Sequence, residues 1–279
     1  MPRWPGRARC DIFLRAKGET ALGRAIAIAN QKGGVGKTTT AVNLAACLAA
    51  AERRTLLVDL DPQGNATSSL GVDRQSVAHH VGDLLFEGTK ATEAMVPTAI
   101  PCLQLVPSRK ELVGAELDLA DLPNRERCLQ DGLADCRDAF DFVLIDCPPS
   151  LGLLTVNAMV AAGSVLVPLQ CEYFALEGLA QILEALNLCR QRLNPGLLLE
   201  GVLLTMFDGR VKLSEQVAKD VREHLPGRVF QTMVPRNVRL SEAPSFGKPV
   251  ILYDIRCPGA EAYLRLAREV IDGGTKGPW

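Results

Sequence analysis

The sequence has no long hydrophobic run. None of its apolar segments approaches the roughly 18 to 20 residues that a helix needs to cross a bilayer. The first residues also lack the apolar core of a secretory signal peptide. We therefore expect a cytoplasmic protein that does not use the membrane.

Metal-binding and disulfide patterns are absent as well. The chain has nine cysteines, an odd number, and three histidines, but it contains no CxxC pair. This pattern supports neither a disulfide framework nor a zinc site. Most of the cysteines fall in apolar stretches, where a reduced cysteine packs as a small hydrophobic residue.

No strong net charge distinguishes the chain. Its 279 residues include 31 Lys and Arg against 32 Asp and Glu, and 47% of them are hydrophobic, as is usual for folded globular proteins. However, residues 111–146 are acidic, whereas residues 1–24 and 208–248 carry an excess of basic side chains. The balanced average therefore does not exclude a polyanionic partner.

Short apolar runs alternate with helical patterns along most of the chain. Strands are predicted at 25–29, 55–60, 102–106, 142–146, 164–169, 199–206, 229–234 and 249–252. Helices are predicted at 37–51, 124–138, 151–162, 175–192, 211–224, near 238–244 and at 258–272. The alternation predicts an α/β fold with a doubly wound, mostly parallel β-sheet flanked by helices. The loops that follow the strands should then share one edge of the sheet, where we expect the active site.

One domain, residues 25–272, accounts for this pattern. Residues 1–24 are arginine-rich and show no clear period, so they are expected to form a basic, flexible N-terminal extension. Asp11 and Glu19 argue mildly against a targeting peptide there. Residues 273–279 are polar and glycine-rich and are expected to form a C-terminal tail.

A glycine-rich loop stands between the first predicted strand and the first predicted helix. Residues 31–39 read Gln-Lys-Gly-Gly-Val-Gly-Lys-Thr-Thr. In a GxxxxGK[ST] loop, backbone N–H groups surround phosphates, the lysine reaches the outer phosphates and the hydroxyl binds Mg²⁺. Gly36, Lys37 and Thr38 supply the end of that pattern, but Gln31 replaces its first glycine and Lys32 adds a second cation. The sequence predicts a variant nucleotide-binding loop rather than a mere tight turn.

Carboxylates end two further predicted strands. Asp59 and Asp61 share a face of one strand end, so either can position Mg²⁺ or the attacking water, or can cap the turn. We favour Asp61 as the functional residue. Asp146 follows the apolar run 142–145, which is the place of the carboxylate that supports Mg²⁺ in phosphate-loop NTPases.

Two arginines, Arg236 and Arg239, lie three residues apart near the predicted short helix 238–244. On a helix they would share one face. Such a pair can bind DNA phosphates, pair with local acids or face solvent, and the spacing alone does not choose among these.

Six segments together resemble the ParA/Soj family of chromosome and plasmid partitioning ATPases, in the deviant Walker A group that includes MinD. They are residues 31–39, 59–65, 146–152, 170–178, 203–208 and 234–247. The resemblance spans about residues 25–270 and implies the P-loop NTPase fold with ATP or ADP and Mg²⁺ as cofactors.

The resemblance also implies catalytic roles. Lys37 would bind the β and γ phosphates, and Lys32 would reach across a dimer interface to the partner's nucleotide. Thr38 would ligate Mg²⁺, and Asp146 would support Mg²⁺ through water. Asp61 would be the third residue of the metal site and would help orient the hydrolytic water.

The remaining nucleotide contacts are implied in the same way. Pro235 and Asn237 lie where the family contacts adenine. The other implied binding residues are Gly33, Gly34, Val35, Gly36 and Thr39.

The function implied is a slow Mg²⁺-dependent ATPase that forms a homodimer on ATP binding. The dimer would bind DNA without sequence preference through Arg236 and Arg239, associate with the nucleoid, and segregate chromosomes or plasmids with a ParB-like centromere-binding protein. A second lysine helps only if geometry delivers it to developing charge, which favours a nucleotide shared by two chains.

Three alternatives remain. One is a MinD-like positioning ATPase, although the C-terminal end lacks an evident amphipathic membrane helix. Another is a metabolic ATP-dependent synthetase on the same scaffold, for which no further constellation is visible. The third is a nucleotide-gated adaptor without turnover, which an intact Asp61 argues against.

Overall fold

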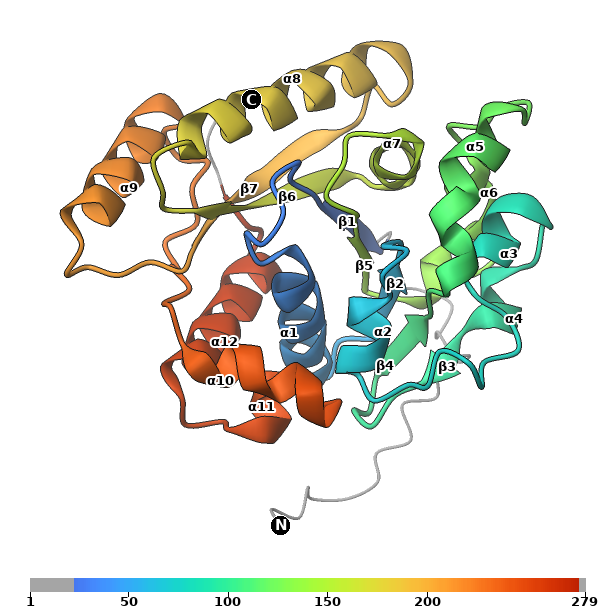
Figure 1. The fold of residues 1–279 in the computed structure, drawn as a ribbon, viewed down its shortest axis with the longest axis horizontal. Helices are drawn as coiled ribbons and strands as arrows, with labels where there is room; N and C mark the ends of the chain where they lie inside the picture. The colour runs from blue at the N-terminus through green and yellow to red at the C-terminus, as the bar shows by residue number, and fades with distance from the viewer. Residues whose placement is uncertain (1–22, 276–279) are drawn as a thin grey trace.

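A seven-stranded sheet forms the centre of the computed structural model, which describes residues 23–275 (Figure 1). The strands are β1 (Arg24–Ile28), β2 (Thr55–Asp59), β3 (Val96–Pro97), β4 (Leu103–Val106), β5 (Phe142–Asp146), β6 (Ser164–Gln170) and β7 (Leu198–Thr205). Their order is β3-β4-β2-β5-β1-β6-β7, and only the short β3 is antiparallel to its neighbour. The predicted doubly wound, mostly parallel sheet is confirmed.

Helices cover both faces of the sheet (Figure 1). One face carries α1 (Lys37–Ala50), α2 (Asn65–Ser69), α10 (Val238–Glu242), α11 (Val250–Tyr253) and α12 (Pro258–Ile271). The other carries α3 (Val81–Phe86), α4 (Ala91–Ala94), α5 (Ala115–Ala120), α6 (Cys128–Gly132), α7 (Leu153–Ala161), α8 (Ala175–Arg192) and α9 (Lys212–His224). The sheet therefore separates two hydrophobic cores.

Strand β1 shows how the sequence supplies both cores. Ile26 and Ile28 pack into the core beneath α1, whereas Ala25 and Ala27 point into the opposite core. Successive side chains of a strand point to opposite faces, so a strand covered on both sides is apolar throughout.

The predicted strand 229–234 is wrong as a continuous strand. The segment runs beside β7, with Phe230 N–H donating to the Val202 carbonyl and Val234 N–H donating to the Leu204 carbonyl. Only isolated bridges, Val202 with Val229 and Phe207 with Pro235, mark the pairing. The ladder is too interrupted to make an eighth strand.

The predicted strand 249–252 is also wrong, because this segment is the helix α11. The Val250 N–H donates to the side chain of Asn43 on α1, and Val250 and Ile251 are buried against the same core. A short run of β-branched residues favours a strand in sequence, but here tertiary contacts select one helical turn.

The predicted helix 124–138 is shorter than expected. It is reduced to α6 and a separate 3-10 turn, Arg137–Ala139. The helices α2 to α5 were not predicted, because elements of four to six residues present too few positions to show a period.

The domain boundaries shift slightly. β1 begins at Arg24, so that residue belongs to the sheet rather than to the predicted extension 1–24, whose residues 1–22 lie outside the described range. At the other end, Thr275 Oγ1 donates to the Glu200 carbonyl, and residues 276–279 of the predicted tail lie outside the described range.

Among the residues that the structure describes, seven cysteines are free, and all of these except Cys128 are buried. Burial raises the pKa of the Cys47 thiol to about 12, as expected of a cysteine that packs as an apolar residue. Within residues 23–275, no helix combines the length and the hydrophobicity needed to cross a membrane.

Asn43 ties α1 to α11, and its loss should destabilise the fold. Its Oδ1 accepts from Val250 N–H at 2.7 Å, and its Nδ2 donates to the Thr39 carbonyl at 2.8 Å. We expect Asn43→Ala to lower the free energy of unfolding by about 1–3 kcal/mol, because a buried N–H loses its acceptor. Urea denaturation measures this. Gln216→Ala, which removes an exposed bond to Asp220, is the control and should change the stability little.

Candidate functional site

The pairing of the central strands brings three strand ends together. In the register of β5, Asp146 lies opposite Ile28 at the end of β1 and opposite Asp59 at the end of β2. The glycine-rich loop follows β1 and the Asp61 loop follows β2. The residues predicted from separate parts of the sequence therefore share one edge of the sheet.

The glycine-rich loop is held in a defined conformation. Gly34 and Gly36 have φ angles of 75° and 91°, which other residues adopt only with strain. Thr205 Oγ1, from β7, donates to the Val35 carbonyl. Asn30 accepts from the Lys32 N–H and donates to the Pro168 carbonyl in β6. Sequence reasoning did not assign these roles to Asn30 and Thr205, because the contacts of Asn30 with Pro168 and of Thr205 with Val35 join segments that are distant in the chain.

Lys37 opens α1 and is buried beneath the loop. Its Nζ donates to the Lys32 carbonyl at 3.0 Å, so its ammonium group is directed back into the loop. Burial lowers its pKa, while the charges of Asp146 and Asp61 act in the opposite direction. A lysine in this position contributes its charge to the space that the loop encloses.

Asp146 is fully buried, and neither of its carboxylate oxygens accepts a hydrogen bond from the described residues. Burial, followed by the nearby charge of Asp59, raises the pKa of Asp146 well above its ordinary value. The Thr38 hydroxyl lies near enough to the Asp146 carboxylate to lower its pKa, which opposes this shift. The distance and angles between the two groups do not meet the criteria for a hydrogen bond.

The Asp146 carboxylate and the Thr38 hydroxyl fit a site for Mg²⁺ better than a site in which protein side chains supply every metal ligand. Buried polar atoms without partners are rare, and an unpaired carboxylate beside a hydroxyl suits a hard cation. No group of three or more His, Cys, Asp or Glu residues that could hold a metal occurs between residues 23 and 275. Mg²⁺ commonly keeps several waters and binds substrate phosphates, so it needs few protein ligands.

Asp59 and Asp61 have different surroundings. Asp59 accepts from the Thr67 N–H at 2.8 Å and from the Thr67 hydroxyl at 2.6 Å, so it ties β2 to α2. Burial raises the pKa of Asp59 to about 6. Asp61 instead accepts from the Gln63 N–H and lies close enough to Lys37 to affect its pKa. Both residues therefore accept backbone hydrogen bonds: Asp61 from the turn that follows it, and Asp59 from the first turn of α2.

A cavity of about 380 Å³ adjoins the glycine-rich loop. Pro235 and Asn237 line it together with Gly36, Thr39 and Tyr263. The Asn237 side-chain oxygen is buried and has no hydrogen-bond partner among the described residues. The cavity therefore has both apolar and polar walls next to the loop, and an unpaired acceptor is buried in one of its lining residues.

The Lys32 side chain has different surroundings from that of Lys37, although its backbone carbonyl accepts from Lys37. Its exposed ammonium group pairs with Glu172 at 3.3 Å. Glu172 belongs to a segment quoted above for its family resemblance, but the sequence did not predict this contact.

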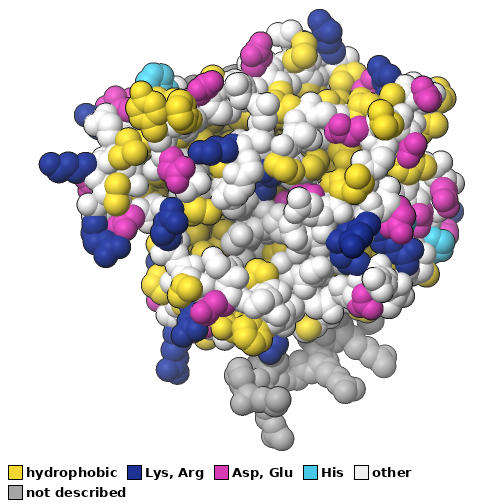
Figure 2. Space-filling view, in the orientation of Figure 1, with side chains coloured by type: hydrophobic (Ala, Val, Ile, Leu, Met, Phe, Trp, Pro, Cys, Tyr) yellow, Lys and Arg dark blue, Asp and Glu magenta, His cyan; other side chains and the backbone are white. Residues whose placement is uncertain are grey.

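The two candidate DNA-binding arginines differ. Arg239 pairs with Glu242 at 2.8 Å and with Asp254 at 3.4 Å, whereas Arg236 is exposed and uses its backbone N–H to donate to the Phe207 carbonyl. Lys and Arg side chains gather at several separate places on the face seen in Figure 2, with acidic side chains between them.

Replacing the Asp146 carboxylate by an amide should stabilise the free protein. A carboxyl whose folded pKa is raised weakens folding above that pKa, and the cost disappears as pH falls towards its ordinary value. We expect Asp146→Asn to raise the free energy of unfolding at neutral pH, with a difference that shrinks in acid. Urea denaturation across pH measures it. Asp121→Asn, at an exposed site, is the control, and an Asp146→Asn variant less stable at neutral pH would contradict this account.

Several known proteins are similar to this chain. Residues 23–199 match a family model described as an AAA domain. The chromosome partitioning protein ParA of Myxococcus xanthus is 54% identical over 93% of this chain and 92% of its own length. The sporulation initiation inhibitor protein Soj of Bacillus subtilis is 51% identical over 91% of this chain and 100% of its own.

Solved structures share the fold. A cobyrinic acid a,c-diamide synthase of Mycobacterium smegmatis with bound ADP and magnesium has a TM-score of 0.80 and 38% identity, covering 92% of this chain and 100% of that one. The cell division ATPase MinD of Pyrococcus furiosus has a TM-score of 0.75 and 29% identity, covering 90% and 99%. The two partitioning proteins named above are more similar in sequence to this chain than these two solved structures are, and the glycine-rich loop, the strand-end carboxylates and the adjoining cavity suit a nucleotide-binding member of that family. The chain belongs to the ParA/Soj family of chromosome-partitioning ATPases.

Proposed function

We propose that this chain binds Mg–ATP, dimerises around the nucleotide, hydrolyses ATP slowly and uses that cycle to partition DNA. The observation that carries the proposal is the unpaired, buried carboxylate of Asp146 beside Lys37 and Thr38 at the glycine-rich loop. A structural relative that contains ADP and magnesium supports the choice of ligands.

The nucleotide would lie along the loop and its cavity. Backbone N–H groups of residues 33–39 and the N-terminus of α1 favour phosphate, and Lys37 adds a full positive charge. The Asn237 oxygen can accept from the amino group of adenine, with Pro235 against the ring. This arrangement gives the phosphates and the adenine of ATP chemically matched partners.

For hydrolysis, Thr38 and Asp146 would hold Mg²⁺, directly and through water. When bound, Mg²⁺ neutralises charge on the transferring phosphoryl group. Asp61 then orients the attacking water from the loop after β2, close to the Lys37 charge. The protein's contribution is mainly to position and stabilise, as is general for phosphoryl transfer.

Dimerisation is proposed from the placement of Lys32. Its ammonium group is exposed and paired only at the surface, where ion pairs contribute little to stability. Lys32 can therefore exchange Glu172 for a phosphate on a second protomer at small cost. ATP would then stabilise the dimer by mass action, and hydrolysis would release it.

DNA binding is proposed for the ATP-bound dimer. Arg236 is exposed, whereas much of the Arg239 charge is neutralised locally, so Arg236 is the stronger candidate for phosphate contact. Two copies held rigidly would bind DNA more tightly than one. A ParB-like centromere-binding protein would stimulate turnover, and the dimer would associate with the nucleoid.

Replacing Lys32 tests the shared nucleotide. We expect Lys32→Ala to bind ATP nearly as the natural chain does, but to lose ATP-dependent dimerisation and at least about tenfold in turnover, since one transition-state contact is worth that much or more. Sizing with ADP and with ATP, together with phosphate release, measures both effects. Lys219→Ala, which removes another exposed lysine paired with a glutamate, is the control. Unchanged turnover in Lys32→Ala would remove this residue from the mechanism.

The two arginines should contribute unequally to DNA binding. We expect Arg236→Ala to weaken binding of random duplex DNA and to reduce the salt dependence by about one phosphate contact per protomer. Arg239→Ala should have a smaller effect, because Glu242 and Asp254 already neutralise much of the Arg239 charge. Salt titrations of the ATP-bound protein measure both, with Arg265→Ala on α12 as the control. If ATP-bound protein shows no salt-sensitive DNA affinity, the DNA part of the proposal fails.

A further inference from the structure

The loop that carries Asp61 is held by an arginine from another segment. The Arg74 guanidinium donates to the carbonyls of Pro62, at 2.8 Å, and of Gln63, the two residues that follow Asp61. Its Nε donates to the Ser108 carbonyl at 3.2 Å, just beyond β4. One planar side chain thus joins the loop after β2 to the loop after β4.

The second loop also contacts Asp61 itself. The Ser108 hydroxyl donates to the Asp61 carbonyl at 2.7 Å, and the Ser108 N–H donates to the Thr67 hydroxyl. The position of the Asp61 backbone therefore depends on how the two loops are joined.

Gly64 makes room for this arginine. Its φ is 63°, and a Cβ built on it would lie 2.3 Å from Nε of Arg74. A side chain at position 64 would displace the guanidinium as well as strain the turn. The close approach shows that loop and arginine are built around each other.

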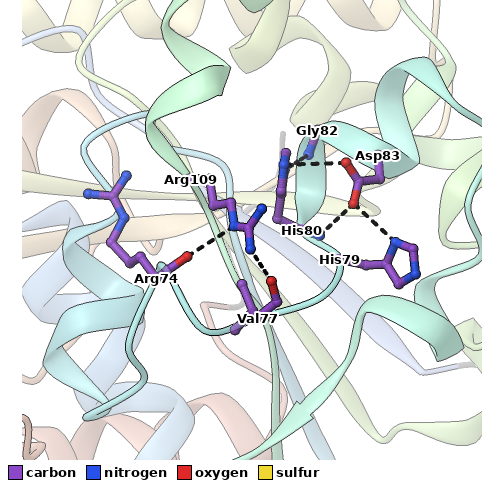
Figure 3. A network of polar contacts seen from close by, with 7 residues as sticks. All are labelled: Arg74, Val77, His79, His80, Gly82, Asp83 and Arg109. Carbon is purple, nitrogen blue, oxygen red and sulfur yellow. Dashed lines mark hydrogen bonds and ion pairs between the residues drawn. The ribbon is translucent and has the colours of Figure 1, made fainter.

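A second arginine holds the segment that carries the first. Arg109 donates from Nε to the Arg74 carbonyl at 3.0 Å and from its other end to the Val77 carbonyl (Figure 3). In the same view, Asp83 and His80 cap the start of α3, which anchors the far end of this segment. The backbone of Arg74 is thus held by Arg109, while its guanidinium donates to the Asp61 loop.

We propose that Arg74 is a positioning residue for hydrolysis: its guanidinium fixes the carbonyls of Pro62 and Gln63 and thereby sets the place of the Asp61 carboxylate. The inference rests on the proposed ATPase function and on the role of Asp61 in it. Arg74 acts through the loop backbone. Its fork of donors suits several carbonyls at once, which the single ammonium group of a lysine does not. Displacing a catalytic group by about 1 Å can cost on the order of 100-fold in rate.

The test compares Arg74→Ala, Arg74→Lys and the natural chain in steady-state ATP hydrolysis and in binding of a fluorescent ATP analogue. We expect kcat to fall by about 10-fold to 100-fold in Arg74→Ala. The analogue's Kd should change less than about twofold, because Arg74 donates to loop carbonyls and is not proposed to contact the nucleotide. A twofold change in Kd corresponds to less than the net free energy of a typical hydrogen bond. Arg74→Lys should retain the charge and still lose most of the rate. Arg125→Ala, which removes another arginine that donates to a backbone carbonyl, is the control and should hydrolyse ATP normally.

The outcomes are separable. If the natural chain does not hydrolyse ATP, the proposed function fails. If it does, and Arg74→Ala or Arg74→Lys matches its kcat, the positioning role is wrong. If Kd weakens as much as kcat falls, Arg74 supports the whole site rather than Asp61, and the inference is overturned. Thermal melting shows whether Arg74→Ala is folded, and Arg74→Lys decides the matter if it is not.

Discussion

The pairing of β5 with both β1 and β2 is the constraint on which the rest of the site depends. β5 lies between these strands, and its last residue, Asp146, is in register with Ile28 and with Asp59. The loops that leave β1 and β2 must therefore start within reach of the same carboxylate. The Lys37 ammonium group and the Asp61 turn belong to the segments that follow these strands, so the pairing of the strands determines where both lie.

The site contains two buried carboxyl groups, which lower the stability of the folded protein unless they are compensated. Asp146 and Asp59 are buried side by side, and their pKa values are raised by burial. Asp59 is compensated by Thr67, whereas Asp146 has no hydrogen-bond partner among the described residues. An uncompensated carboxylate is expensive to bury, so its retention is best explained by a ligand that supplies the missing charge.

Support for the reactive groups comes from distant parts of the chain. Thr205 from β7 and Asn30 fix the glycine-rich loop, while Arg74 and Ser108 fix the loop after β2. These contacts constrain backbone carbonyls and N–H groups of the two loops, and so limit where the side chains that we propose for catalysis can lie. The same arrangement explains how loops can carry precise chemistry on a rigid sheet.

The sequence by itself determined the parallel α/β fold, the nucleotide loop and the strand-end carboxylates, because apolar periods and glycine-rich turns are local signals. It misjudged 249–252 and 229–234, where contacts with Asn43 and β7 selected a helix and an interrupted ladder. It favoured Asp61 over Asp59 as the functional residue, but it left a turn-capping role open for either, since both share one face of the strand end. Only the tertiary structure decided that Thr67 donates to Asp59, that Glu172 pairs with Lys32 and that Arg74 donates to the Asp61 loop. Each of these depends on which segments the sheet brings together, and no local pattern in the chain records that.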